Sequence, residues 1–206
     1  DRRLTMRAWG ERDLTAAICW AARRDHGAPV FVVGHSFGGQ ALGLAANADR
    51  VSRAVLVAAQ HGWAGHWSLR DQLLLRPLWH LAMPLLATVL GRFPSSWFGL
   101  GEDLPCGVAR DWAAWGRRRA RFGPWAGRAA VRSPLLVYSV SDDRFAPPRA
   151  VEALIGAYAG AKVRHRRLRP EEFGLATLGH WAFFREGVMP SVWADVVEFL
   201  GGGDAS

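Results

Sequence analysis

Three short apolar runs, rich in β-branched residues, most narrowly limit what this chain can fold into. They are PVFVVG at 29–34, RAVLVAAQ at Arg53–Gln60 and SPLLVYSV at Ser133–Val140. Continuous apolar runs of this length are typical of strands buried on both faces. Helical patterns separate them, and strands that alternate with helices are joined by crossovers in a parallel sheet. We therefore expect an α/β fold with a mainly parallel sheet flanked by helices.

The segments around these runs fit the same architecture. Leu14–Arg24 and Pro148–Tyr158 are predicted to be helices, and Ser191–Leu200 is predicted to be a terminal amphipathic helix. The sequence KVRHRRLRP at 162–170 alternates and is highly charged, which is typical of a strand at the edge of a sheet.

The alternation of strand and helix breaks between about residues 61 and 132. That stretch contains no clear strand, and it holds seven of the eleven tryptophans: Trp63, Trp67, Trp79, Trp97, Trp112, Trp115 and Trp125. We predict that residues 1–60 and 133–206 form the α/β core. Residues 61–132 are predicted to form a helical insertion.

Leu73–Leu90 within this insertion has the length of a membrane span. It contains the charged Arg76 and two prolines, Pro77 and Pro84, that interrupt a helix. We interpret it as a pair of short apolar helices and expect no membrane partner.

The formal net charge of +8 suggests nucleic acid at first sight. Nearly all of the positive charge is arginine, since Lys162 is the only lysine, and the densest arginine runs lie in no nucleic-acid module. A solvated basic face explains them more simply. The two cysteines, Cys19 and Cys106, form neither a disulfide framework nor a metal-ligand pattern, which favours a reducing, cytoplasmic compartment.

Gly34-His35-Ser36-Phe37-Gly38 fits the pattern G-x-S-x-G between a predicted strand and a predicted helix. On such a turn a serine is forced into a strained conformation that projects its hydroxyl above the sheet, and the residues two before and two after must be small. The amide of Phe37 then opens the helix and can donate to an oxyanion. A glycine-rich helix start or a phosphate cradle is the alternative, but the P-loop ending is missing. The pattern favours Ser36 as a nucleophile.

A nucleophilic serine needs a base, and the base needs an acid that orients it. In this type of site the acid follows a later strand. The run at Ser133–Val140 leads into Asp142 and Asp143, and the position of Pro147 favours Asp143. Asp142 stays open, and either aspartate could instead cap the next helix.

The base is expected last in the chain, in a loop after a further strand. His180 follows Gly179 in such a loop, ahead of a helical segment. We therefore predict His180 as the base. The other candidates fit less well: His35, His61, His66 and His165. No cysteine, histidine or acidic cluster completes a metal site with His61 and His66, so we expect neither a metal nor a cofactor.

Three stretches, GHSFGGQALGL, GRFPSSWFGLGEDLPCGVARDWAAW and LGHWAFFRE, resemble the α/β-hydrolase superfamily and within it a group of bacterial predicted hydrolases. The resemblance covers most of the chain. It implies that Ser36 is the nucleophile, Asp143 the acid and His180 the base. It also implies that residues 61–132 form a cap over the site.

The chain departs from that superfamily at its start. The turn that carries the nucleophilic serine, called the nucleophile elbow, usually follows the fifth of about eight strands. Here it follows the first predicted strand. A loop after an early strand normally supplies the second oxyanion donor, and losing one donor typically costs about 10²–10³ in rate. Because the sequence begins with Asp1, we expect it to be the carboxyl-terminal two-thirds of a longer protein. Alone, it is expected to expose an apolar strand edge, to be poorly soluble and to be nearly inactive.

These features together predict a serine hydrolase that cleaves an ester or other acyl bond of a small, apolar substrate. Acyl transfer by the same triad stays open, as does a non-catalytic binding protein with this fold. The tryptophans of the insertion could line the substrate site or form the insertion's own core. The substrate, the leaving group and the oligomeric state stay open.

Overall fold

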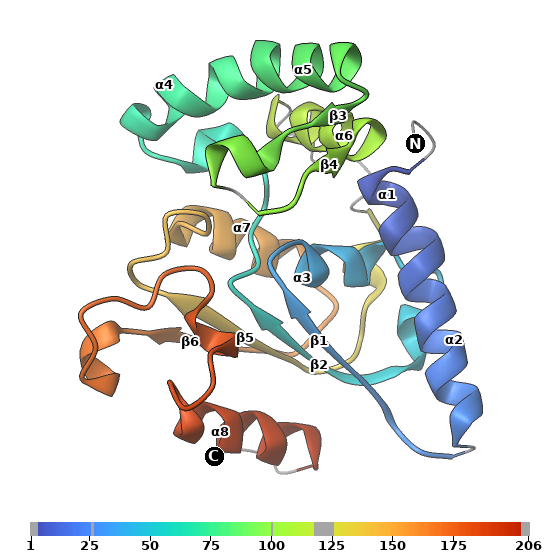
Figure 1. The fold of residues 1–206 in the computed structure, drawn as a ribbon. Coiled ribbons are helices and arrows are strands. Elements are labelled where there is room, and N and C mark those ends of the chain that lie inside the picture. The colour runs from blue at the N-terminus through green and yellow to red at the C-terminus, as the bar shows by residue number, and fades with distance from the viewer. Residues whose placement is uncertain (1–3, 26, 100, 118–125, 203–206) are drawn as a thin grey trace.

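The fold is built on one four-stranded parallel sheet, seen in a computed structural model that describes residues 4–25, 27–99, 101–117 and 126–202 (Figure 1). The strands stand in the order β1-β2-β5-β6. Their bounds are β1 Val30–His35, β2 Val51–Val57, β5 Leu135–Val140 and β6 Val163–Leu168. Every neighbouring pair is parallel, which confirms the predicted architecture.

The strands match the predicted runs with shifted ends. β2 starts at Val51 and stops at Val57, three residues before the predicted end, because Ala58 has a φ of 49° and turns the chain away. β6 lies at one edge of the sheet, as predicted from its charge. β1 forms the other edge among the described strands, and its Phe31 and Val33 are 38% and 42% exposed.

Helices cover both faces of the sheet (Figure 1). One face packs against α2 (Thr15–Arg24) and α7 (Pro148–Ala157) through an apolar cluster that includes Ile18 and Leu154. The other face packs against α8 (Pro190–Leu200). The remaining elements of this core are α1 Met6–Ala8, the π-helix η1 Trp9–Leu14, α3 Phe37–Ala41, and the 3₁₀ turns η2 Leu42–Leu44, η3 Ala48–Arg50, η8 Pro170–Phe173 and η9 Ala182–Phe184.

The segment between β2 and β5 is mainly helical and lies above the sheet edge where β1 leads into α3 (Figure 1). Its elements are η4 Ala64–His66, α4 Leu69–Pro77, η5 Leu78–Ala82, α5 Met83–Val89, β3 Arg92–Phe93, η6 Ser95–Phe98, β4 Leu104–Pro105, α6 Cys106–Arg117 and η7 Ala126–Ala130. It has its own apolar cluster around Trp79, Met83 and Phe93. The sequence predicted no strand here, and the structure adds one antiparallel pair of two-residue strands, β3 and β4.

The pair of short helices predicted at Leu73–Leu90 is a nearly continuous helical rod. α4 passes through the π-helix η5 directly into α5, with Pro77 at the end of α4 and Pro84 in the first turn of α5. Proline removes one intrahelical hydrogen bond, and a local π turn is a common way to absorb that loss without ending the helix. In the part of the chain that is described, no helix is both long and apolar enough to cross a membrane.

Close packing at the start of α3 falls on Gly34 and Gly39. A Cβ on Gly34 would lie 2.7 Å from the carbonyl carbon of Gly38, which confirms the need for a small residue at 34. A Cβ on Gly39 would lie 2.5 Å from the Cβ of Ala59, whereas a Cβ on Gly38 would meet no atom within 4 Å. The prediction that residue 38 must be small was therefore wrong, because its Cβ position faces open space.

Helix α7 and the helical segment meet at the half-buried His61. The amide of His61 donates to the carbonyl of Ala150 (2.8 Å), and its ring is hydrogen-bonded to His66 (3.1 Å). Burial lowers the pKa of His61, and the nearby His66 and Arg128 act in the same direction, so that the pKa falls to about 4. His61 is therefore neutral in the folded protein at pH 6, where an unfolded histidine is mostly protonated.

Replacing Gly39 tests the packing below the turn. We expect Gly39→Ala to lower the free energy of unfolding by about 1–3 kcal/mol, because overpacking a filled site carries that cost. Urea denaturation followed by circular dichroism measures it. Gly38→Ala, one residue earlier in the same helix, is the matched control and should keep or raise stability, since glycine costs helices about 0.5–1 kcal/mol relative to alanine. Equal losses in both variants would contradict this packing.

The buried His61 predicts a pH-dependent stability. Between pH 6.5 and 4 the unfolded chain binds a proton that the folded chain does not, so stability falls as the pH falls, by roughly 2–3 kcal/mol in total. In His61→Gln this part of the pH dependence should vanish, while it should persist in a variant of the exposed His80, His80→Gln. Urea denaturation at several pH values measures both. An unchanged pH profile in His61→Gln would rule the effect out.

Candidate active site

Ser36 stands at the junction between β1 and α3 in a strained backbone conformation. Its φ is 51° and its ψ is −115°. Its amide donates to the carbonyl of Val57 in the neighbouring strand (2.9 Å), and its carbonyl accepts from Gly39 (3.2 Å). A non-glycine residue in such a region costs about 1–3 kcal/mol and persists only where its surroundings fix it, most often at functional sites.

The amide of Phe37 is the first of α3. First-turn amides have no acceptor within their own helix, so this N–H is available to a negatively charged oxygen beside Ser36. The Phe37 ring packs between Trp9 of the N-terminal helix (6.0 Å between centroids) and Trp115 of α6 (6.1 Å). The Phe37 ring thus links the turn at Ser36 to the π-helix η1 and to α6 of the helical segment.

Buried polar contacts hold α3 from its far side. The Tyr158 hydroxyl donates to the carbonyl of Gly39 (2.7 Å) and accepts from the amide of Gly43 (3.2 Å). The fully buried Arg128 donates to the carbonyl of Gln40 (2.8 Å). Burial lowers the pKa of Arg128 to about 10, which still leaves it charged at neutral pH. Neither role was predicted from the sequence.

Asp143 and His180 form a buried hydrogen-bonded pair. Oδ2 of Asp143 lies 2.7 Å from Nδ1 of His180, and the side chains are 0% and 4% exposed. Oδ1 of Asp143 accepts from the amides of Phe145 (2.8 Å) and Ala146 (3.2 Å). A carboxylate only accepts, so Nδ1 of His180 carries the proton and Nε2 is left as a proton acceptor.

Asp142 has a different set of partners. Its carboxylate accepts from the hydroxyl of Thr177 (2.6 Å) and from the amides of Leu178 (3.0 Å) and Gly179 (3.0 Å). Burial acts to raise the pKa of Asp142, but these hydrogen bonds outweigh it and the pKa is lowered. Of the two aspartates that the sequence left open, Asp143 contacts the His180 ring and Asp142 contacts the loop just before it.

The turn at Ser36 and the His180 loop meet through His35. Nε2 of His35 lies 2.9 Å from the carbonyl oxygen of His180, and the two rings are 4.7 Å apart. The hydroxyl of Ser36 makes no hydrogen bond to the His180 ring within the described residues. Such bonds are often long or misaligned before substrate binds. The structure thus joins Asp143 to His180 directly and brings the loop that carries His180 against His35, the residue preceding Ser36.

The other histidines have partners away from this group. His165 on β6 lies 2.8 Å from the hydroxyl of Ser139, and His61 and His66 contact each other. Among the described residues no cluster of three or more His, Cys, Asp or Glu side chains could hold a metal ion.

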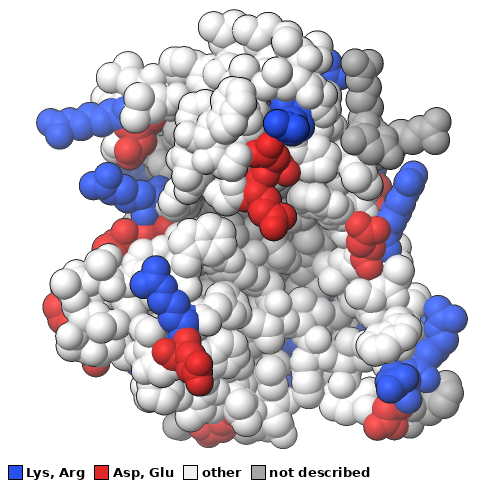
Figure 2. Space-filling view, in the orientation of Figure 1, with Lys and Arg blue, Asp and Glu red and all other residues white. Residues whose placement is uncertain are grey.

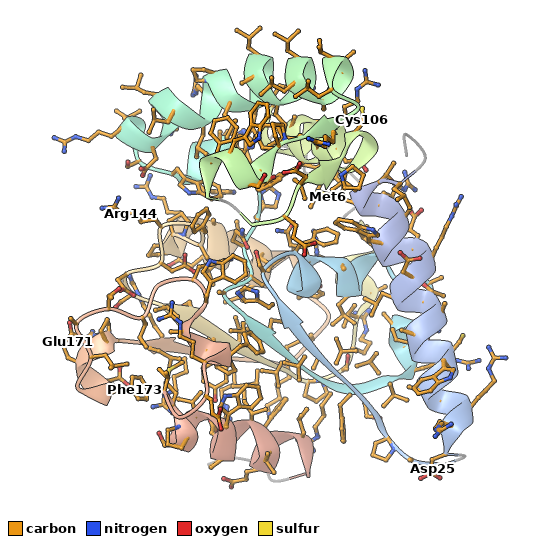
Figure 3. All side chains as sticks on the ribbon, in the orientation of Figure 1. Met6, Asp25, Cys106, Arg144, Glu171 and Phe173 are labelled. Carbon is orange, nitrogen blue, oxygen red and sulfur yellow. The ribbon has the colours of Figure 1, made fainter. Side chains whose placement is uncertain are left out.

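A mainly apolar pocket of about 320 Å³ lies between the helical segment and the end of the sheet at which β1 leads into α3. Met6 and Arg144 line opposite ends of it (Figure 3). Phe145 connects it to the His180 ring (5.2 Å), and Trp115 connects it to Phe37. The rest of the lining consists of Gln40, Gln60, Gly62, Trp67, Asp71, Leu74, Leu75, Leu78, Trp79 and Trp112.

The tryptophans of the helical segment are divided between its apolar core, the wall of this pocket and the exposed surface. Trp67 and Trp79 are buried in the segment's own core and also form part of the pocket wall. Trp112 and Trp115 line the pocket, whereas Trp97 is 66% exposed. Trp125 lies outside the described residues.

Charged side chains are scattered on the face shown in Figure 2. Lys and Arg side chains stand beside Asp and Glu side chains there, and the surface over α4 and α5 is largely uncharged. The densest arginine run of the sequence falls largely at 118–121, outside the described residues.

Comparison with known proteins agrees with this fold. Residues 2–195 match the model of the alpha/beta hydrolase family. No curated protein matches the sequence.

Three solved structures that resemble this one are 15–17% identical to it, a level at which the likeness shows the fold. DcsB, in complex with its substrate analogue, has a TM-score of 0.62 at 15% identity over 97% of this chain and 74% of its own. A structure of the metagenome-derived lipolytic enzymes LipS and LipT has 0.60 at 17% over 97% and 75%. The alpha/beta hydrolase GrgF from Penicillium sp. sh18 has 0.59 at 15% over 98% and 74%. With its family match, its parallel sheet and its strand–turn–helix at Ser36, the chain belongs to the alpha/beta hydrolase family.

Proposed function

We propose that this protein is a serine hydrolase that cleaves an ester or related acyl bond of a small apolar substrate. The observation that carries the proposal is the strained turn at Ser36 beside a buried pair of Asp143 and His180. A serine is inert without a base, and a histidine whose Nδ1 is held by a carboxylate is a suitable one.

The chemistry proceeds in two halves. In the first, Nε2 of His180 takes the proton of the Ser36 hydroxyl while Oγ attacks the acyl carbon, and the amide of Phe37 donates to the resulting oxyanion. The intermediate expels the alcohol, which receives the proton from His180, and leaves an acyl-enzyme. In the second, water gives one proton to His180 and attacks the acyl carbon. The bond from that carbon to Oγ of Ser36 then breaks, the acid is released, and His180 returns the proton to Oγ. Asp143 holds the imidazole in the required tautomer throughout.

The pocket supports an apolar acyl group. Its lining is largely leucine, tryptophan and phenylalanine, and it lies next to His180 through Phe145. Apolar pockets of this size, with a few polar groups, suit small molecules. In this proposal residues 61–132 act as a cap that closes over the bound acyl chain. The lipolytic activity of one structurally similar protein agrees with this substrate class.

Covalent labelling tests the nucleophile. A fluorophosphonate probe is expected to label the full-length wild-type protein at Ser36, to leave Ser36→Ala unlabelled, and to label Asp143→Asn about 10²–10⁴-fold more slowly because the imidazole loses its orienting acid. Intact mass and peptide mapping identify the labelled residue.

Ser52→Ala is the control for this experiment, because Ser52 is an exposed serine on the neighbouring strand β2. It should label like the wild type. A properly folded wild-type protein whose Ser36 never reacts would overturn the proposal and favour a non-catalytic binding protein.

The pocket predicts an acyl-chain preference. Across p-nitrophenyl esters from acetate to decanoate, kcat/KM is expected to rise as the chain fills the apolar pocket and then to fall, since each buried methylene contributes about 0.8 kcal/mol. Continuous absorbance assays measure this. A preference for acetate, or for a charged acyl group, would contradict an apolar acyl site. Added short alcohols reveal any acyl transfer by the same nucleophile.

A further inference from the structure

The loop that carries His180 is tied to the rest of the protein on both sides of that residue. It leaves η8, contains Gly179 at a φ of 63°, and enters η9 just after Trp181. A loop of this kind has few backbone partners of its own, so its conformation depends on side chains that reach it from other elements.

On the side before His180, Asp142 accepts three hydrogen bonds from residues 177–179, at 2.6, 3.0 and 3.0 Å. Asp142 and Asp143 follow β5 directly and are neighbours in the chain. Because side chains of adjacent residues diverge, one carboxylate reaches the His180 ring while the other reaches the backbone ahead of it. Hydrogen bonds to an ionised group are the stronger kind, which suits Asp142 to hold a loop.

On the other side, His35 reaches the carbonyl of His180 itself. A carbonyl oxygen only accepts, so Nε2 of His35 donates the hydrogen bond across the 2.9 Å between them. The His35 ring also packs against the rings of His180 (4.7 Å), Trp181 (4.8 Å) and Phe184 (5.3 Å). Since His35 directly precedes Ser36, the same residue fixes the distance between the turn and the base loop.

We propose that His35 and Asp142 are positioning residues that together set the place of the His180 ring relative to Ser36. The proposal rests on the hydrolase function proposed above. Neither side chain touches the reacting atoms. Asp142 fixes the backbone before His180 and His35 fixes its carbonyl, so the imidazole can pivot only within the limits that Asp143 and these two residues leave.

Three variants test this proposal through the rate of the chemical step. His35→Phe keeps a ring but removes the donor, His35→Gln restores an amide donor, and Asp142→Asn weakens the acceptor of the loop. We expect His35→Phe and Asp142→Asn each to lower kcat and the fluorophosphonate labelling rate about tenfold with KM little changed. A lost hydrogen bond of about 1–1.5 kcal/mol corresponds to that factor. His35→Gln should recover most of the rate.

Two matched controls separate positioning from general destabilisation. Asp103→Asn weakens in the same way an acceptor that holds the amide and hydroxyl of Ser96 in the helical segment, far along the chain from the base loop. His165→Phe removes a hydrogen-bonded histidine of β6. Both should label at the wild-type rate. Thermal denaturation of every variant shows whether a slower rate reflects partial unfolding.

The outcomes are distinct from failure of the hydrolase proposal. If wild-type Ser36 never labels, the hydrolase function itself is wrong. If the wild type labels, and both His35→Phe and Asp142→Asn label as fast as the wild type, the positioning role is wrong. A loss in His35→Phe that His35→Gln does not recover would also overturn the donor role of His35. A second readout, the NMR chemical shifts of the His180 ring, should change in both slow variants and in neither control.

Discussion

The turn at Ser36 is the constraint on which the rest of this structure depends. The chain leaves a buried strand, reverses at a positive φ and enters a helix within two residues. That path requires the absence of a side chain at Gly34, where a Cβ would strike the backbone of Gly38, and at Gly39, where it would strike Ala59. Tyr158 and Arg128 then hold the carbonyls of the new helix from below. Contacts from separate parts of the chain thus fix the strained conformation of Ser36.

Parallel strand order explains why the other two members of the proposed triad come to this turn. β5 and β6 lie beyond β2, so the loops after them open at the same sheet edge as the turn after β1. Asp143 and His180 form a buried hydrogen bond there, and a hydrogen bond to a carboxylate is stronger in a buried site than in water. The helical segment, the N-terminal Met6 and Phe145 enclose an apolar pocket next to this group. The proposed function therefore assigns the chemistry to the carboxyl end of the sheet and substrate selection to the helical segment above it.

The sequence predicted the parts of this structure that depend on local pattern. The buried strands, the charged edge strand and the glycine requirement at Gly34 follow from periodicity and turn chemistry. Chain order placed an aspartate and His180 together and favoured Asp143, but it left Asp142 open as the partner of His180. It could not show that Gly39 rather than Gly38 is packed, because that depends on Ala59 from the next strand. The continuous helix through Pro77 and the contacts of His35 and Asp142 depend likewise on the folded arrangement. These contacts join residues far apart in the chain and follow no recognisable sequence pattern.

The central claim is that Ser36 forms a covalent acyl-enzyme, and rapid-mixing kinetics with a p-nitrophenyl ester test it most directly. We expect a burst of p-nitrophenolate of about one equivalent per chain, followed by slower turnover, with the acyl group found on Ser36 by mass spectrometry of the quenched reaction. Turnover that persists in Ser36→Ala at the wild-type rate, with no acylated serine at any time, would contradict it.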